Sequence, residues 1–290
     1  MRILFAGDEH PYSAYALKEV VNLARNTWAD VTLLGVQPPA AAKEEGFAGA
    51  GTGTAALRRY RKDFLESWQG EESPYDLKNW RYEWVPLQDG LWEEMLVCRG
   101  VKKDLHVRVR VGSLAQEIVA EAGAEHSDLI VLGTTKGAEC IWNGAPAVPQ
   151  KVAGDAACSV LLVKEERPID RILACLDQSY ISQSSLEILN QMVTIHRAEL
   201  EIIGLSPEGG LKKEVYTRLI ELGDYYTDRQ VKVATRLTDI KDFEASIAQE
   251  AKPDLLALWM GKKSLLQRFF PRDWVGRFVA KCQTSILVMR

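Results

Sequence analysis

The sequence predicts an α/β protein built as a tandem duplication, each half an open five-stranded parallel sheet with helices on both faces. Residues 129–132 (LIVL) and 160–163 (VLLV) are continuous apolar runs, typical of strands buried on both sides. Residues 2–8, 14–24 and 29–36 have strand, helix and strand patterns in succession. A strand-helix-strand unit of this length makes its two strands parallel.

The duplication is visible as segments that recur at fixed offsets. Asp128 and Asp254 each introduce a buried strand and stand 126 positions apart, as do the final strands at residues 159–163 and 285–289. Nearer the start of each half the offset is 169, so the first half holds 43 extra residues. The segments at the larger offset are residues 2–8 and 171–177, and residues 29–38 and 198–207.

These offsets predict a first domain at residues 1–166, with an insertion within residues 39–103, and a second domain at residues 167–290. The insertion carries Trp80, Trp84 and Trp92. Two interpretations of these tryptophans stay open. They cover the surface of the enlarged domain itself, or they form a platform for a partner or a ligand, where Trp is enriched.

Composition excludes several classes of protein. The net charge of −4 argues against nucleic acid as the main partner. No apolar run approaches the roughly 20 residues that a membrane span needs, and the chain starts directly with a strand pattern instead of a signal peptide. Five cysteines without a CxxC pair favour a reducing cytoplasm over a disulfide framework or a zinc site. Cys140 is expected to lie in a loop and therefore to be the most reactive of the five.

Six segments carry a resemblance to a known family: RILFAGD, SDLIVLGT and CSVLLV in the first half, and RILACLD, PDLLALW and SILVM in the second. Together they resemble the universal stress protein family, in its tandem, two-domain form. The resemblance implies a Rossmann-like fold, similar to the adenine nucleotide alpha hydrolases, with strand order 3-2-1-4-5 in each sheet. Many members bind ATP, and many dimerise through their last strands. The final strands of the two halves are therefore expected to meet as an internal pseudo-dimer, with a homodimer as a further option.

Nucleotide-binding members of the family have a loop with Gly, two residues, Gly, nine residues, Gly, and then Ser or Thr. Glycines let the backbone approach the phosphates, and the following helix N-terminus supplies N–H donors. The first half matches in part. Asp8 after the first strand and Gly133 fit, Lys136 stands at the second glycine position, and Gly137 follows one residue late. With Val36 on the second strand, these are the expected nucleotide-binding residues.

The last positions of the loop weaken this expectation. Pro146 and Ala147 replace Gly-Ser, and Pro149 removes another N–H from the same turn. His10 beside Asp8 is expected as a solvated loop residue, with a role in the site as the alternative.

In the second half Asp177 fits, but Trp259, Lys262, Arg272 and Asp273 occupy the loop positions. Trp259 is expected to fill the space, and Asp273 to cap the helix and repel phosphate. The second half is therefore expected to be empty. The basic and aromatic stretch at residues 262–277 is either an exposed loop with tucked aromatic rings or a site for an anion or a partner.

No Ser-His-Asp arrangement, paired metal ligands or Walker loop is visible, so the sequence predicts that the protein is not an enzyme. The leading hypothesis is a stress-response or regulatory binding protein with a degenerate nucleotide-binding motif in both halves. It would act through a protein partner or a small ligand and hold no cofactor. The alternative is a stress sensor that binds ATP or AMP in the first half.

Overall fold

The computed structural model describes residues 1–39, 52–68, 73–75, 80–88, 91–98, 103–135, 140–142, 145–164, 166–176, 181–206, 213–249, 253–261, 264–270 and 273–290. Ten strands form one sheet. Those of the first half are β1 (Arg2–Ala6), β2 (Asp30–Gln37), β5 (Leu105–Val111), β6 (Leu129–Gly133) and β9 (Ser159–Val163). Those of the second half are β10 (Arg171–Leu176), β11 (Glu199–Ser206), β12 (Val233–Asp239), β13 (Leu255–Trp259) and β14 (Ser285–Met289).

The strand order across this sheet is β12-β11-β10-β13-β14-β9-β6-β1-β2-β5. Within each half all neighbours are parallel, and the third, second, first, fourth and fifth strands lie in that order. The final strands pair antiparallel, with Leu287 opposite Leu161. The two five-stranded halves are therefore parts of one sheet and not two separate sheets, because the backbones of β9 and β14 pair with each other.

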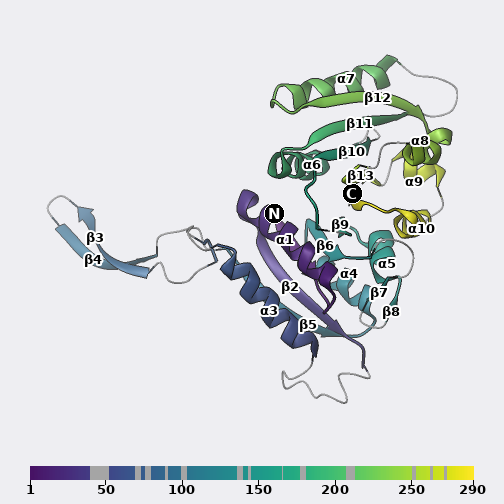
Figure 1. Cartoon of the computed structure of the whole chain (residues 1–290). Coiled ribbons are helices and arrows are strands. Elements are labelled where there is room, and N and C mark those ends of the chain that lie inside the picture. Colours follow the sequence, from purple (N-terminus) through teal and green to yellow (C-terminus); the bar gives the residue numbers. More distant parts are fainter. Residues whose placement is uncertain are drawn as a thin grey trace.

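Helices cover both faces of the sheet (Figure 1). Alternate residues of a strand point to opposite faces, so Ile3 and Phe5 belong to one buried core and Leu4 and Ala6 to the other. The first face carries α1 (Pro11–Thr27), α3 (Thr52–Glu66), α6 (Gln183–His196) and α7 (Lys213–Thr227). The second carries α4 (Leu114–Ala124), α5 (Val148–Asp155), α8 (Phe243–Gln249), α9 (Leu265–Phe269) and α10 (Trp274–Lys281), with the short 3-10 helix η1 (Ile240–Asp242) before α8.

A basic residue after the first half's final strand reaches across the junction. Lys164 is 5% exposed, and its ammonium donates to the carbonyl oxygen of Val279 at 2.8 Å and to that of Cys282. These carbonyls lie at the C-terminal end of α10, where a positive charge is favourable. The backbone N–H of Lys164 donates to Ser285 Oγ at 3.1 Å. Burial lowers the pKa of Lys164, and the two carbonyl oxygens replace the water that its charge has lost.

The second half makes an equivalent contact with the first. Arg290 stands at the position equivalent to Lys164, and its guanidinium donates to the carbonyl oxygens of Ala153 at 2.6 Å, Gly154 at 3.1 Å and Ala156. These three carbonyl groups lie at the C-terminal end of α5. The backbone N–H of Arg290 donates to Ser159 Oγ at 3.2 Å. Each half thus caps the last helix of the other, and the contacts flank the β9–β14 pair on both sides.

The insertion in the first half forms a two-stranded antiparallel hairpin, β3 (Trp80–Gln88) and β4 (Leu91–Cys98). It projects from the body of the molecule (Figure 1). Trp84 is 64% exposed and Trp92 is 56% exposed. The interpretation that the tryptophans cover the domain's own surface is therefore wrong for these two, because the hairpin does not fold back onto the sheet.

Two further strands are short: β7 (Ile141–Trp142) and β8 (Ala145–Pro146), which pair antiparallel. Within the described ranges, no helix combines the length and the apolar character that a membrane span requires.

Replacing Arg290 with Met should lower the free energy of unfolding by about 1.5–3 kcal/mol, because the change removes hydrogen bonds from a charged group and leaves buried carbonyls unpaired. Urea denaturation measures this. The control is Arg218→Met, since the ion pair of Arg218 with Glu221 on α7 is exposed and should contribute less than about 1 kcal/mol. Equal losses in the two variants would show that the cap on α5 contributes nothing.

Acid should weaken the second half through Glu201. Burial by itself would raise the pKa of this carboxyl, but hydrogen bonds and charges from Arg171 and Arg236 outweigh it and hold the pKa below its usual value. The stabilisation is therefore complete at neutral pH and is lost as the pH falls below about 4. In urea titrations the deficit of Glu201→Gln should shrink as the pH is lowered. Glu199→Gln on the same strand, where the ion pair is exposed, should show no such trend.

Candidate functional site

Asp8 lies just beyond the carboxyl end of β1, the edge at which parallel α/β sheets bind ligands. The residue is only 2% exposed. Its Oδ1 accepts hydrogen bonds from Ser13 Oγ at 2.7 Å and from the backbone N–H of His10 at 3.1 Å. Its Oδ2 accepts from the hydroxyl of Tyr12 at 2.6 Å and lies 3.0 Å from His10 Nδ1, which donates to it in the Nδ1-protonated form.

An ionised carboxyl group has about four acceptor sites. Three of them take donors from His10 N–H, Tyr12 and Ser13, and the Nδ1-protonated form of His10 supplies a fourth. The hydroxyl of Ser13 also accepts from the backbone N–H of Asp8 at 3.1 Å. Tyr60 on α3 donates to the main-chain carbonyl of Asp8. Asp8 therefore anchors the start of α1, where a negative charge is favourable, and in the Nδ1-protonated form of His10 its acceptor sites are filled within the chain.

Tyr12 occupies the middle of this site. Its ring stacks on that of His10, with centroids 5.1 Å apart and planes 2° apart. Burial raises the pKa of Tyr12, and the hydrogen bond to the negative Asp8 raises it further, so the phenol stays protonated and acts as a donor. The ring of His10 is half exposed, yet it belongs to the site and is not merely a solvated loop residue.

Gly133 has a structural explanation in the same place. A Cβ at this position would lie 2.3 Å from the carbonyl oxygen of Tyr12, so the start of α1 approaches β6 too closely for any side chain. Val36 is 2% exposed and belongs to the same buried core as Tyr12. Of the five residues expected to bind nucleotide, Asp8, Val36 and Gly133 are thus engaged within the protein. Lys136 and Gly137 lie outside the described residues.

The start of α5 differs from a phosphate-binding helix start. Ala147 precedes the helix with φ 58° and ψ 28°, a left-handed conformation that glycine adopts more readily than alanine. Its side chain makes no capping bond, and Pro149 in the first turn has no N–H. Val148, Pro149 and Gln150 are buried. The helix therefore presents fewer N–H groups to an anion than a Gly-Ser start would.

The loop before α5 also places Cys140 and Trp142 inside the protein, 1% and 0% exposed. The expectation that Cys140 is the most reactive cysteine is therefore wrong. Cys158 and Cys282 are more exposed, although burial raises the pKa of Cys158 to about 11. The sequence places Cys140 in a loop, but it does not show that the loop folds inward against Tyr12.

The equivalent region of the second half is filled by aromatic side chains. Trp259 at the end of β13 is 3% exposed, and a Cβ at Gly261 would lie 2.4 Å from its ring. Near the start of α10, Trp274 stacks on Phe270 and Phe278 with centroids 4.4 and 4.7 Å away. The interpretation as tucked aromatic rings therefore holds for Phe270 and Trp274.

Phe269 is the exception in that stretch, at 46% exposed. Asp273 does not cap α10 as expected; its carboxylate pairs with Arg277 at 3.4 Å instead. Asp177, Lys262 and Arg272 lie outside the described residues.

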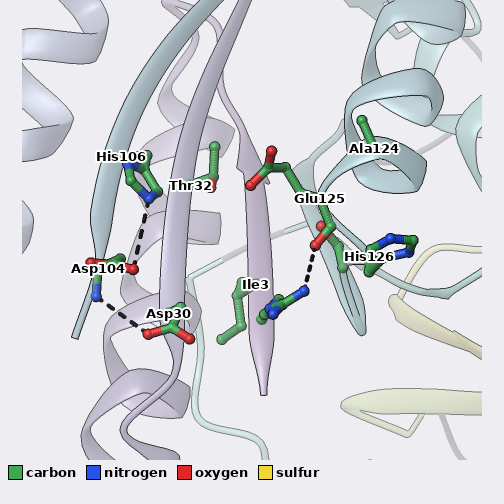
Figure 2. A pocket seen from close by; sticks show the side chains of 10 residues that line it. Ile3, Asp30, Thr32, Asp104, His106, Ala124, Glu125 and His126 are labelled. Atoms are coloured by element: carbon green, nitrogen blue, oxygen red, sulfur yellow. Dashed lines mark hydrogen bonds and ion pairs between the residues drawn. The ribbon is translucent and has the colours of Figure 1, made fainter. Parts of the chain in front are cut away.

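A hollow lies at the edge of the sheet opposite to Asp8, at the amino ends of β1, β2 and β5 (Figure 2). It has a volume of about 230 Å³ and polar walls. The backbone N–H of Asp104 donates to Asp30 Oδ1 at 3.3 Å, and Arg2 Nη1 donates to the carbonyl oxygen of Glu125 at 3.2 Å (Figure 2). His106 Nε2 lies 4.0 Å from Asp104.

These residues come from distant parts of the chain, so sequence spacing could not reveal the hollow. Charges of both signs line it and pair with one another. Across the ranges that the structure describes, no group of three or more His, Cys, Asp or Glu side chains could hold a metal ion. The edge that carries Asp8 is therefore the better candidate site.

The fold and the residues at this edge define an α/β protein with parallel five-stranded halves and a buried carboxylate at the carboxyl end of its first strand. The sequence profile of the Universal stress protein family matches residues 1–164. The chain belongs to this family. A search among curated protein sequences gives no match.

Solved structures share the fold over the whole chain at low identity. A universal stress protein from Archaeoglobus fulgidus DSM 4304 superposes with a TM-score of 0.57 at 15% identity, over 100% of this chain and 96% of that one. A functionally unknown protein from Pseudomonas aeruginosa PAO1 reaches 0.61 at 16%, over 99% and 92%. The cytoplasmic domain of a prokaryotic cation chloride cotransporter reaches 0.53 at 10%, over 99% and 94%. Such likeness shows the fold and not the function.

Replacing Asp8 with Ala should lower the free energy of unfolding by about 3 kcal/mol or more, because at least two buried hydroxyl donors and one backbone N–H lose their acceptor. Chemical denaturation followed by circular dichroism measures the change. The matched control is Asp63→Ala on α3, where the carboxylate is exposed. A loss for Asp8→Ala as small as that of the control would contradict the anchoring role.

Proposed function

We propose that this chain is a regulatory, stress-response binding protein of the universal stress type, which acts through a partner or a small ligand and not through catalysis. In this proposal the nucleotide-binding motif is degenerate in both halves. The observation that carries it is the state of Asp8, whose carboxylate accepts three hydrogen bonds from the same chain and a fourth from His10 when its Nδ1 is protonated. An adenine would have to displace these donors before it could bind there.

Further support comes from the phosphate end of the crevice. A nucleotide-binding helix start offers several N–H groups, whereas here Pro146 and Pro149 have none and Ala147 is strained. Hydrogen bonds to a charged group contribute roughly 1.5–3 kcal/mol each, so two missing donors weaken binding by a factor of about a hundred to ten thousand. In the second half, Trp259 is buried near the same position and Asp273 has the wrong charge for a phosphate.

Two features support the non-catalytic and cytoplasmic parts of the proposal. The hydroxyls of Tyr12 and Ser13 both donate to Asp8, and burial with the neighbouring Asp8 raises the pKa of Tyr12, so neither hydroxyl is a ready base or nucleophile. The four cysteines that the structure describes are unpaired, as in a reducing compartment.

The alternative function is an ATP or AMP sensor with its site in the first half. Membership of the family and the positions of Asp8 and Gly133 favour it. It requires the start of α1 to move, because Tyr12 now contacts both residues. This cost separates the two functions experimentally.

Calorimetric titration with ATP and Mg²⁺ decides between them. We expect no binding, or a dissociation constant no better than high micromolar, for the reasons of lost donors given above. One tight site that Asp8→Asn abolishes, in a variant whose circular dichroism is unchanged, would favour the sensor instead. Two tight sites per chain would overturn the proposal of degenerate motifs. Glu166→Gln, far from the crevice and exposed, serves as the control.

A further inference from the structure

The hairpin β3–β4 presents an aromatic face to solvent. Trp84 lies opposite Glu94 and Trp92 opposite Pro86 in the antiparallel register. Paired residues point to the same side of a sheet, and so does every second residue along a strand. Trp84 and Trp92 therefore share one face of the hairpin, at 64% and 56% exposed, while the hairpin projects from the body (Figure 1).

A hairpin of this kind is stabilised when another protein element packs on its aromatic face. A two-stranded hairpin alone is marginally stable in water, and it becomes stable when further strands or a helix pack on it. Trp side chains bury 150–250 Å² each and concentrate at the centres of protein interfaces. Two of them on one exposed face indicate a docking surface, and the charges beside them indicate what it contacts.

The charges of the hairpin and of α3 are complementary. Glu94 is exposed on β4 and, two residues after Trp92, lies on the same face as both tryptophans. On α3, Arg58, Arg61 and Lys62 are exposed, and Leu65 is 39% exposed. Residues spaced by three, four and seven positions form one face of a helix, so these four make a basic outer face with an apolar end.

We propose that the hairpin of one copy of this protein docks on the outer face of α3 in a second copy. Guanidinium groups of Arg58 and Arg61 would stack on the exposed tryptophan rings and pair with Glu94 of the other copy. Because every chain carries both surfaces, the contact is made twice in a two-fold dimer. The hairpin points away from its own α3, which leaves that helix face open for the partner copy (Figure 1).

This dimer does not use the candidate site, because it involves the exposed face of α3, whereas Tyr60 on the buried face contacts Asp8. It also differs from pairing through final strands, because β9 and β14 already pair within the chain. A different protein with a basic helix is the competing occupant of the hairpin, and it would leave the purified protein monomeric.

Sedimentation velocity of the full chain at a series of concentrations gives the first test. We expect a dimer, with Trp84→Ala and Trp92→Ala each raising the dissociation constant about thirtyfold or more, as for residues at the centre of an interface. Trp28→Ala is the control, because Trp28 is also 47% exposed but lies at the end of α1. Wild-type protein that stays monomeric at about 100 μM, where an interface of standard size would be occupied, overturns the proposal.

A charge exchange gives the second test and identifies the two surfaces. Glu94→Lys makes both surfaces basic, and Arg58→Glu with Arg61→Glu makes both acidic, so each variant alone should be monomeric. An equimolar mixture should recover a dimer of one chain of each kind, because both contacts are again attractive. Circular dichroism checks that both variants are folded. Folded variants that dimerise alone, or fail to associate on mixing, would show that these surfaces do not meet.

Discussion

The antiparallel pairing of β9 with β14 is the contact on which the rest of the architecture depends. Each final strand is buried and apolar throughout, and a sheet edge of that kind would invite aggregation. Pairing the two edges removes both at once. Lys164 and Arg290 stabilise the helices beside this junction. Lys164 donates to the C-terminal end of α10, and Arg290 donates to the C-terminal end of α5. The duplication thus supplies within one chain what two separate chains would otherwise supply.

The limited number of acceptor sites on Asp8 explains the arrangement of the candidate site in the first half. A carboxylate after the first strand can hold either a ligand or the start of the next helix, because its acceptor sites are limited. In this chain Tyr12 and Ser13 take them. Gly133, which would let a nucleotide approach, is in contact with Tyr12 instead. Asp8 and Gly133 therefore each have a structural role in the contact between α1 and the sheet.

The insertion changes the surface of the first half and leaves its core unaltered. Helix α3 packs Leu57, Tyr60 and Phe64 onto the sheet, as α7 does with Leu219 and Tyr226 in the other half. The hairpin that follows α3 has no equivalent among the described residues of the second half. A feature unique to one half of a duplicated chain belongs to contacts beyond the shared fold, which agrees with its exposed tryptophans.

The sequence by itself determined the strands of the two halves of the main sheet, their parallel direction within each half and the duplication, because apolar runs and recurring segments are local patterns. It also identified Asp8 and Gly133 as members of one site, since the carboxyl ends of neighbouring strands meet at one edge. Only the tertiary structure decided that the Asp8 carboxylate accepts hydrogen bonds from the start of α1, that Cys140 is buried and that Trp84 is exposed. Each of these depends on which way a loop or a helix start folds in space. That direction follows from packing between distant residues, which no local pattern records.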